Sequence, residues 1–382
     1  MSSLPPSLRS LSPSLALRLA ATLALAFAAA RLCLWLRTPL PWMIGPLVAV
    51  SLASVAGAPV ASALPLRNAA QWTIGTSLGL YFTPAVVALV ATLWWAVGLT
   101  ILWVIGAGLL AGAWLYRLHA PGVAAAGGDL RALRATTFFA ASAGGASEMT
   151  VLAERARART DLVAASHSLR VLVVAVLVPF CLQAAGVHGL DATPPATREV
   201  DGLGLAALLA LTAAGALLMR RWRQPNPWFL GALATATALT LSGVALSAVP
   251  QAASNAAQLL IGAGLGVRFQ PAFLRMAPRW MLAVTASTLL VTAACAAFGM
   301  ALSWLTALHW GTLVLATSPG GLSEMSITAK MLQLGVPVVT AFQVCRLSAV
   351  LVAMEPLYRW LYGNAALDAA PAQRPDGDDG TD

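Results

Sequence analysis

The sequence FFAASAGGASEMTVLAE fills positions 138–154, and the related sequence LATSPGGLSEMSITAK fills positions 315–330. Each is an apolar run interrupted by paired glycines and a glutamate, and the second also contains Pro319. Glycine and proline weaken helices, and backbone freed at membrane depth is tolerated only inside protein or beside a water-filled cavity. The two stretches therefore predict two interrupted helices within a helical membrane protein.

These stretches belong to a duplicated unit. PWMIG at 41–45 recurs as PWFLG at 227–231, and QWTIGTSLGLYFTP at 71–84 recurs as QLLIGAGLGVRFQP at 258–271 with seven identities. An arginine follows each Gly-rich stretch at one constant spacing, Arg170 in the first half and Arg346 in the second. Four motifs in the same order indicate a repeat of about 180 residues.

Composition decides the class of protein. Hydrophobic residues make up 59% of the 382 residues, charged residues only 10%, and the mean hydropathy is +0.79. A soluble domain carries about 25% charged residues, and a disordered chain needs low hydrophobicity, so both classes are excluded. The fold expected is an all-α polytopic membrane protein. The net charge of +9 comes from arginines scattered between apolar segments, which is typical of the positive-inside rule rather than of nucleic-acid binding.

Cysteines and histidines number four each, without CxxC, HxxxH or HExxH spacing. This pattern predicts neither a disulfide framework nor a metal site. We therefore expect no cofactor and no enzymatic activity.

The positions of the basic residues predict how the Gly-rich segments run. If these segments cross the membrane, 9 of the 21 Lys and Arg residues outside the spans are cytoplasmic. If they are re-entrant, with five crossings in each half, 17 are cytoplasmic, including Arg67, Arg155 and Arg268, and four are outside, namely Arg31, Arg37, Arg198 and Lys330. The larger bias favours the re-entrant arrangement. Five is an odd number, so the halves must be two inverted repeats, with about ten transmembrane helices plus two broken or re-entrant Gly-rich segments.

This scheme sets the expected boundaries. An uncleaved first helix is favoured over a signal peptide because the apolar stretch continues to Trp35 and has a counterpart at 203–219. We expect a cytoplasmic segment at 1–13, a first membrane repeat at 14–188, a linker at 189–201, a second membrane repeat at 202–363 and a disordered acidic tail at 364–382.

Charged groups at membrane depth are the first candidates for a site, because they are costly there. Glu148 and Glu324 either bind a proton or cation, or cap their own helices while exposed amides hold an anion. Arg170 and Arg346 either clasp an anionic substrate or pair with the nearby glutamates. The substrate- or ion-binding set also includes Gly144, Gly145, Ser147, Ser318, Gly320, Gly321, Ser323 and Gln343.

Three further residues are candidates for lining a pathway: Gln71, Gln258 and His167. His167 is more often a hydrogen-bonded core residue than a proton carrier. The two glutamines precede Gly75-xxx-Gly79 and Gly262-xxx-Gly266. Such GxxxG pairs are mainly devices for close packing between membrane helices.

The duplicated unit, with its SAGG and SPGG sequences each followed by an arginine-bearing helix, resembles the AbrB membrane-protein family of Gram-negative bacteria. The resemblance is strongest over residues 315–350 and covers about residues 15–362. It departs from the pattern at Ala143, where the family has proline. Family members are labelled ammonia monooxygenase or regulator of gene expression, and the family is similar to transporters with inverted repeats.

The function expected is that of a secondary-transporter-like, multi-pass protein of the bacterial inner (plasma) membrane. It would move a small solute, for which an anion is one candidate, through a midplane site between the repeats. The alternative is a membrane-embedded regulator that acts indirectly on gene expression. The monooxygenase label is disfavoured for lack of ligands. Expected partners are the lipid bilayer and a small-molecule solute, with H+ or a cation as a coupling ion; direct nucleic-acid binding is not expected, and a homo-oligomer is compatible with the sequence.

Overall fold

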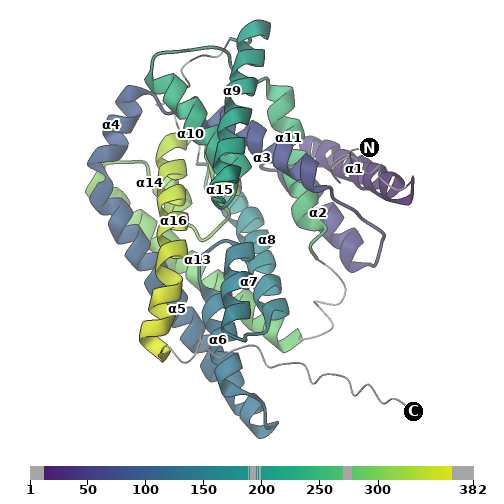
Figure 1. The fold of residues 1–382 in the computed structure, drawn as a ribbon, viewed down its shortest axis with the longest axis vertical. Coiled ribbons are helices and arrows are strands. Elements are labelled where there is room, and N and C mark those ends of the chain that lie inside the picture. The colour runs from purple at the N-terminus through teal and green to yellow at the C-terminus, as the bar shows by residue number, and fades with distance from the viewer. Residues whose placement is uncertain are drawn as a thin grey trace, which may run out of the picture.

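The computed structural model describes residues 13–187, 189, 195, 197, 199–269 and 278–363. The N-terminal segment and the acidic tail expected from the sequence lie outside the described residues, as does much of the expected linker. Within the described part the secondary structure is entirely helical (Figure 1), and it comprises α1 (Pro13–Trp35), α2 (Pro41–Val55), α3 (Leu64–Gly79), α4 (Pro84–Thr92), α5 (Trp94–Ala125), α6 (Leu130–Ala141), α7 (Ala146–Arg155), α8 (Thr160–Ala184), α9 (Gly202–Arg221), α10 (Pro227–Leu241), α11 (Gln251–Gly266), α13 (Pro278–Thr306), α14 (Trp310–Thr317), α15 (Leu322–Met331) and α16 (Val336–Tyr362).

The helices form two bundles, and each bundle takes helices from both halves of the chain. In the first bundle α2 packs on α1 and α11, and α10 packs on α3 and α9. The second bundle contains α5–α8 and α13–α16, and it includes both interrupted helices. In Figure 1, α1, α2 and α11 lie on the right, and α4, α5 and α16 lie on the left. The bundles meet where α15 and α16 touch α3 and where α8 touches α2.

The GxxxG motifs join the repeats within the first bundle. A Cβ added at Gly75 of α3 would lie 2.4 Å from the carbonyl oxygen of Phe229 on α10. A Cβ added at Gly262 of α11 would lie 2.3 Å from the carbonyl oxygen of Met43 on α2. Gly262 is the repeat counterpart of Gly75, and Phe229 that of Met43, so the two contacts are equivalent and reciprocal. The expected close-packing role of these glycines is confirmed.

Six of the described helices are long and apolar enough to cross a membrane, three from each repeat: α1, α5, α8, α9, α13 and α16. A seventh span would require α3 and α4 to count as one, although they are bent by 89° relative to each other. The shorter helices α2 and α10 are apolar as well. These features fit a membrane protein, while the ten crossings expected from the sequence remain a prediction.

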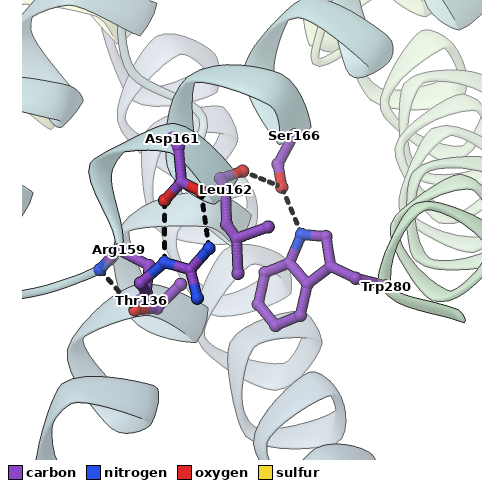
Figure 2. Close-up of polar contacts among 6 residues, drawn as sticks. All are labelled: Thr136, Arg159, Asp161, Leu162, Ser166 and Trp280. Carbon is purple, nitrogen blue, oxygen red and sulfur yellow. Dashed lines mark hydrogen bonds and ion pairs between the residues drawn. The ribbon is translucent and has the colours of Figure 1, made fainter. Parts of the chain in front are cut away.

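The turn that leads from α7 into α8 is fixed at three points (Figure 2). The backbone N–H of Arg159 donates to Thr136 Oγ1 of α6 at 2.9 Å, and the guanidinium of Arg159 pairs with Asp161 at 2.6 Å. One turn further on, Ser166 Oγ accepts a 3.0 Å bond from the Trp280 indole of α13. The hydrogen bond to Asp161 raises the pKa of Arg159. This junction positions α8, the helix that carries His167 and Arg170.

Candidate functional site

Both interrupted helices break at the predicted glycines. In the first repeat α6 ends at Ala141, residues 142–145 turn, and α7 begins at Ala146; in the second α14 ends at Thr317, residues 318–321 turn, and α15 begins at Leu322. The chain therefore forms two half-helices in each repeat. The first turn of α15 is buried, whereas that of α7 is partly exposed. Helix N-termini such as these attract anions.

Each glycine of the GGxSEM motif accommodates one particular side chain. A Cβ at Gly144 or Gly320 would lie within 3 Å of the methionine five residues later. A Cβ at Gly145 or Gly321 would overlap the carboxyl group of the glutamate three residues later. Gly145 and Gly321 are the N-cap residues of α7 and α15, so both glutamates fold back over their own helix N-termini, as in a capping box.

The two arginines donate hydrogen bonds to the backbone of the two turns. In the first repeat the Arg170 guanidinium donates to the carbonyl oxygens of Ser142 at 2.7 Å and Gly144 at 3.3 Å. In the second repeat the Arg346 guanidinium donates to the carbonyl oxygens of Ser318 and Gly320, the latter at 2.9 Å. These carbonyls lie at the broken helix ends, which lack internal partners.

An ion pair with a neighbouring glutamate was one of the two interpretations open for these arginines. Among the described residues neither arginine makes one. Each guanidinium instead keeps one buried Nε–H without a partner in the described part of the chain.

His167 and Gln343 are counterparts that make the same contact. Gln343 Nε2 donates to the carbonyl oxygen of Leu315 at 2.8 Å, and His167 Nε2 lies 2.9 Å from that of Phe139. Since Arg170 can only donate, its 2.7 Å contact to His167 Nδ1 makes that nitrogen an acceptor. The proton of the neutral ring is therefore on Nε2 and donates to the backbone, as the Gln343 amide does.

One cavity of about 190 Å³ lies at the boundary between the bundles and is lined by residues of both repeats. From the second bundle, its walls include Pro319 and eleven residues that were predicted from the sequence: Gly144, Gly145, Ser147, Glu148, His167, Arg170, Gly320, Gly321, Ser323, Glu324 and Arg346. From the first bundle it is lined by Arg67, Gln71, Asn226, Ile261, Gly264, Leu265 and Arg268. The cavity thus brings together most of the predicted residues.

Three predicted residues do not line this cavity. Ser318 and Gln343 are fully buried behind the second turn, where they contribute to its hydrogen bonds. Gln258, although it is the repeat counterpart of Gln71, is buried on α11 and is absent from the cavity wall. The two repeats therefore contribute unequally to the cavity.

Sequence reasoning missed Arg67 and Arg268, which were counted only as cytoplasmic charges. The sequence contained a signal for each. Arg67 lies four residues before Gln71, on the same face of α3. Arg268, in the second repeat, occupies the position that Tyr81 occupies in the first. The charges of both arginines act on the carboxyl group of Glu324. Burial lowers the pKa of Arg268, and the charge of Arg67 lowers it further.

The cavity wall is positive overall. It contains four guanidinium groups and two carboxyl groups, to which the N-termini of α7 and α15 add partial positive charge. The two carboxyl groups differ in their surroundings, since Glu324 is 5% exposed and Glu148 is only half-buried.

Comparison with known proteins places this arrangement in a family. The family described as "Transition state regulatory protein AbrB" matches residues 42–362, and the chain belongs to the AbrB family. A Bacillus subtilis (strain 168) protein named "Uncharacterized protein YhjN" is 27% identical over 346 residues, covering 84% of this chain and 87% of that protein. An Escherichia coli (strain K12) protein named "Putative regulator AbrB" is 26% identical over 333 residues, covering 85% and 90%. No solved structure matches the chain.

Proposed function

We propose that this protein is a secondary transporter that moves a small anion through the cavity between its two bundles. The observation that carries the proposal is the convergence of both interrupted helices and four arginines on one cavity. Broken helices that meet between repeats are the usual construction of transporter sites, where half-helix N-termini face anionic groups. The excess of positive groups favours an anion over a cation.

The proposal includes an inner-membrane, multi-pass topology with inverted repeats. Reciprocal packing of α2 on α11 and α3 on α10 supports a twofold relation between the halves. Helices of 15 and 16 residues are about 22–24 Å long, shorter than a hydrocarbon core of about 30 Å. Local thinning of the bilayer accommodates such a mismatch, so these four helices complete ten crossings.

The topology is tested by cysteine labelling in intact cells. With both termini cytoplasmic, a cysteine replacing Pro195 should react with a membrane-impermeant maleimide from outside, whereas one replacing Leu130 should react only after the cells are opened. Equal labelling at the two positions, or the reverse order, would contradict the inverted arrangement.

Transport itself is tested by uptake of radiolabelled phosphate, sulfate, acetate and succinate into liposomes that contain the purified protein. Saturable uptake of at least one of these anions, absent from protein-free liposomes, is the expected result. Preferential uptake of a small cation would contradict the proposal.

A membrane regulator is the second candidate, because the E. coli relative is named as a regulator. Such a protein would bind a solute in the same cavity without moving it, and it would act on gene expression indirectly. Binding without uptake would therefore favour the regulator. Neither role involves catalysis or direct contact with nucleic acid.

A further inference from the structure

The boundary between the bundles is closed by a polar contact between α15 and α3. Lys330, in the last turn of α15, donates through Nζ to Ser77 Oγ of α3 at 2.6 Å. The same ammonium lies 6.0 Å from the ring centroid of Tyr81, just beyond α3. Ser77 is buried and Lys330 is half-buried, and the hydrogen bond between them makes this a closed contact.

The repeat defines which residues would form the same contact in the first half. The spacing of 176 residues between the Gly-rich segments makes Glu154 the counterpart of Lys330. The spacing of 187 residues between α3 and α11 makes Gly264 the counterpart of Ser77, and Arg268 that of Tyr81. The counterpart contact would join Glu154 of α7 to Arg268, which are oppositely charged.

In the structure this counterpart contact is open. Gly264 and Arg268 line the cavity instead, Glu154 is exposed, and α7 does not pack on α11 as α15 packs on α3. Among the described residues neither Glu154 nor Arg268 has an ion-pair partner. The cavity thus occupies the place where a symmetric molecule would be closed.

We propose that these two contacts are alternating gates of the cavity: Glu154 closes on Arg268 and Gly264 when Lys330 leaves Ser77 and Tyr81. This inference rests on the proposed transport function and specifies how access to its site is switched. Approach of Glu154 neutralises Arg268, whose other charged neighbours are Arg67 and Glu324. Release of Lys330 ends its bond to Ser77 and opens the opposite side.

The charge distribution assigns a side to each gate. Arg67, Arg155 and Arg268 belong to the basic set expected in the cytoplasm, whereas Lys330 belongs to the small set expected outside. Gly264 and Arg268 therefore form part of a cytoplasmic mouth, and the structure represents the state that is open to the cytoplasm.

Two cysteine pairs test the exchange in full-length protein whose four native cysteines have been replaced by alanine. Ser77→Cys with Lys330→Cys reports the outer gate, and Glu154→Cys with Gly264→Cys reports the inner one. A Cβ at Gly264 would meet only Ser62 Oγ, at 3.4 Å, so this position tolerates cysteine. Bismaleimide cross-linking in membranes gives the rate for each pair, and Ser77→Cys with Glu154→Cys is the matched control that should not cross-link.

With Lys330 in place we expect the inner pair to cross-link slowly. The outer pair itself replaces Ser77 and Lys330, so it serves only to show that α3 and α15 come within reach of the cross-linker. Adding Lys330→Ala to the inner pair should raise its rate by about tenfold, because losing a hydrogen bond to a charged donor favours the other state by at least that factor. The proposal that the two gates alternate is overturned if the inner pair fails to cross-link in both backgrounds, or if its cross-linking rate is the same with and without Lys330.

A charge swap provides a second readout in uncross-linked protein. Glu154→Lys or Arg268→Glu alone should reduce the labelling of a cysteine at position 77 by an external maleimide, since the inner gate closes less often, and the two together should restore it. Failure of the pair to restore labelling would overturn the assignment of these partners. Both readouts report movement without any solute, so their failure is distinguishable from a failure of anion uptake.

Discussion

Replacing Arg346 by alanine is expected to lower the free energy of unfolding by about 2–5 kcal/mol, because it removes two charge-assisted hydrogen bonds to buried carbonyl oxygens, and Gln343 continues to donate to only one of them, that of Ser318. The Arg346 side chain is 3% exposed and bonds the carbonyls of Ser318 and Gly320. Those carbonyls define the turn between α14 and α15, so the variant should also lose uptake. Thermal and denaturant unfolding of detergent-purified protein measure the loss.

Two comparisons make this expectation specific. Arg155→Ala is the matched control, since that side chain is 62% exposed and makes only a 3.6 Å surface pair with Glu355, for which a loss of at most about 1 kcal/mol is expected. Arg346→Gln combined with Glu324→Gln separates a structural ion pair from the carbonyl bonds seen here. Full recovery of stability in the double variant would contradict the account, because the glutamine cannot reproduce the fork that bonds both carbonyls.

Replacing Glu324 by glutamine is expected to tighten anion binding by about tenfold, since it removes a negative charge from the site. The carboxyl group folds over Gly321 at the N-terminus of α15, and Ser323 Oγ bonds it at 3.1 Å. It therefore occupies the place that an incoming anion would take, in the same cavity as Arg67 and Arg268 and within reach of their charges. Anion-dependent thermal stabilisation with phosphate, sulfate, acetate and succinate measures the affinity.

The same substitution should remove a pH dependence. Protonation of Glu324 at low pH eliminates the competing carboxylate, so the wild-type protein should bind sulfate, whose own charge does not change, more tightly as pH falls, and Glu324→Gln should lose this dependence. His167→Gln, which installs the residue of the other repeat, is the matched control and should keep the dependence. The explanation is wrong if the dependence disappears with His167 and persists without Glu324.

Repetition in the sequence is enough to predict the elements of the site but not its state. The GGxSEM motif predicted both helix breaks, and the common spacing of Arg170 and Arg346 predicted their equivalence. Which of two equivalent contacts is closed depends on the conformation, and a repeat specifies both equally. The asymmetry between Gln71, on the cavity wall, and buried Gln258 was therefore beyond sequence reasoning.

The roles of the arginines show a second limit. Cost at membrane depth marks Arg346 as a candidate, but it does not distinguish a carboxylate partner from backbone carbonyls, which are present in every turn. The sequence did not indicate Arg67 and Arg268 as site residues, because arginines at helix ends already satisfy the positive-inside rule and need no other explanation. Hydropathy likewise identifies long helices such as α5 and leaves short ones such as α2 undecided.

The most direct measurement of the central claim is anion uptake into liposomes by the wild-type protein and by a variant with Arg67→Gln and Arg268→Gln. Both arginines line the cavity and belong to the first bundle, so their removal leaves the turns held by Arg170 and Arg346 intact. We expect the wild-type protein to give saturable, protein-dependent uptake of a small anion, and this uptake should fall at least about tenfold in the variant. Each lost charge weakens the attraction of the anion to the cavity by roughly 1 kcal/mol or more. Uptake that is unchanged in the variant, or that is found for cations and not for anions, would contradict the account.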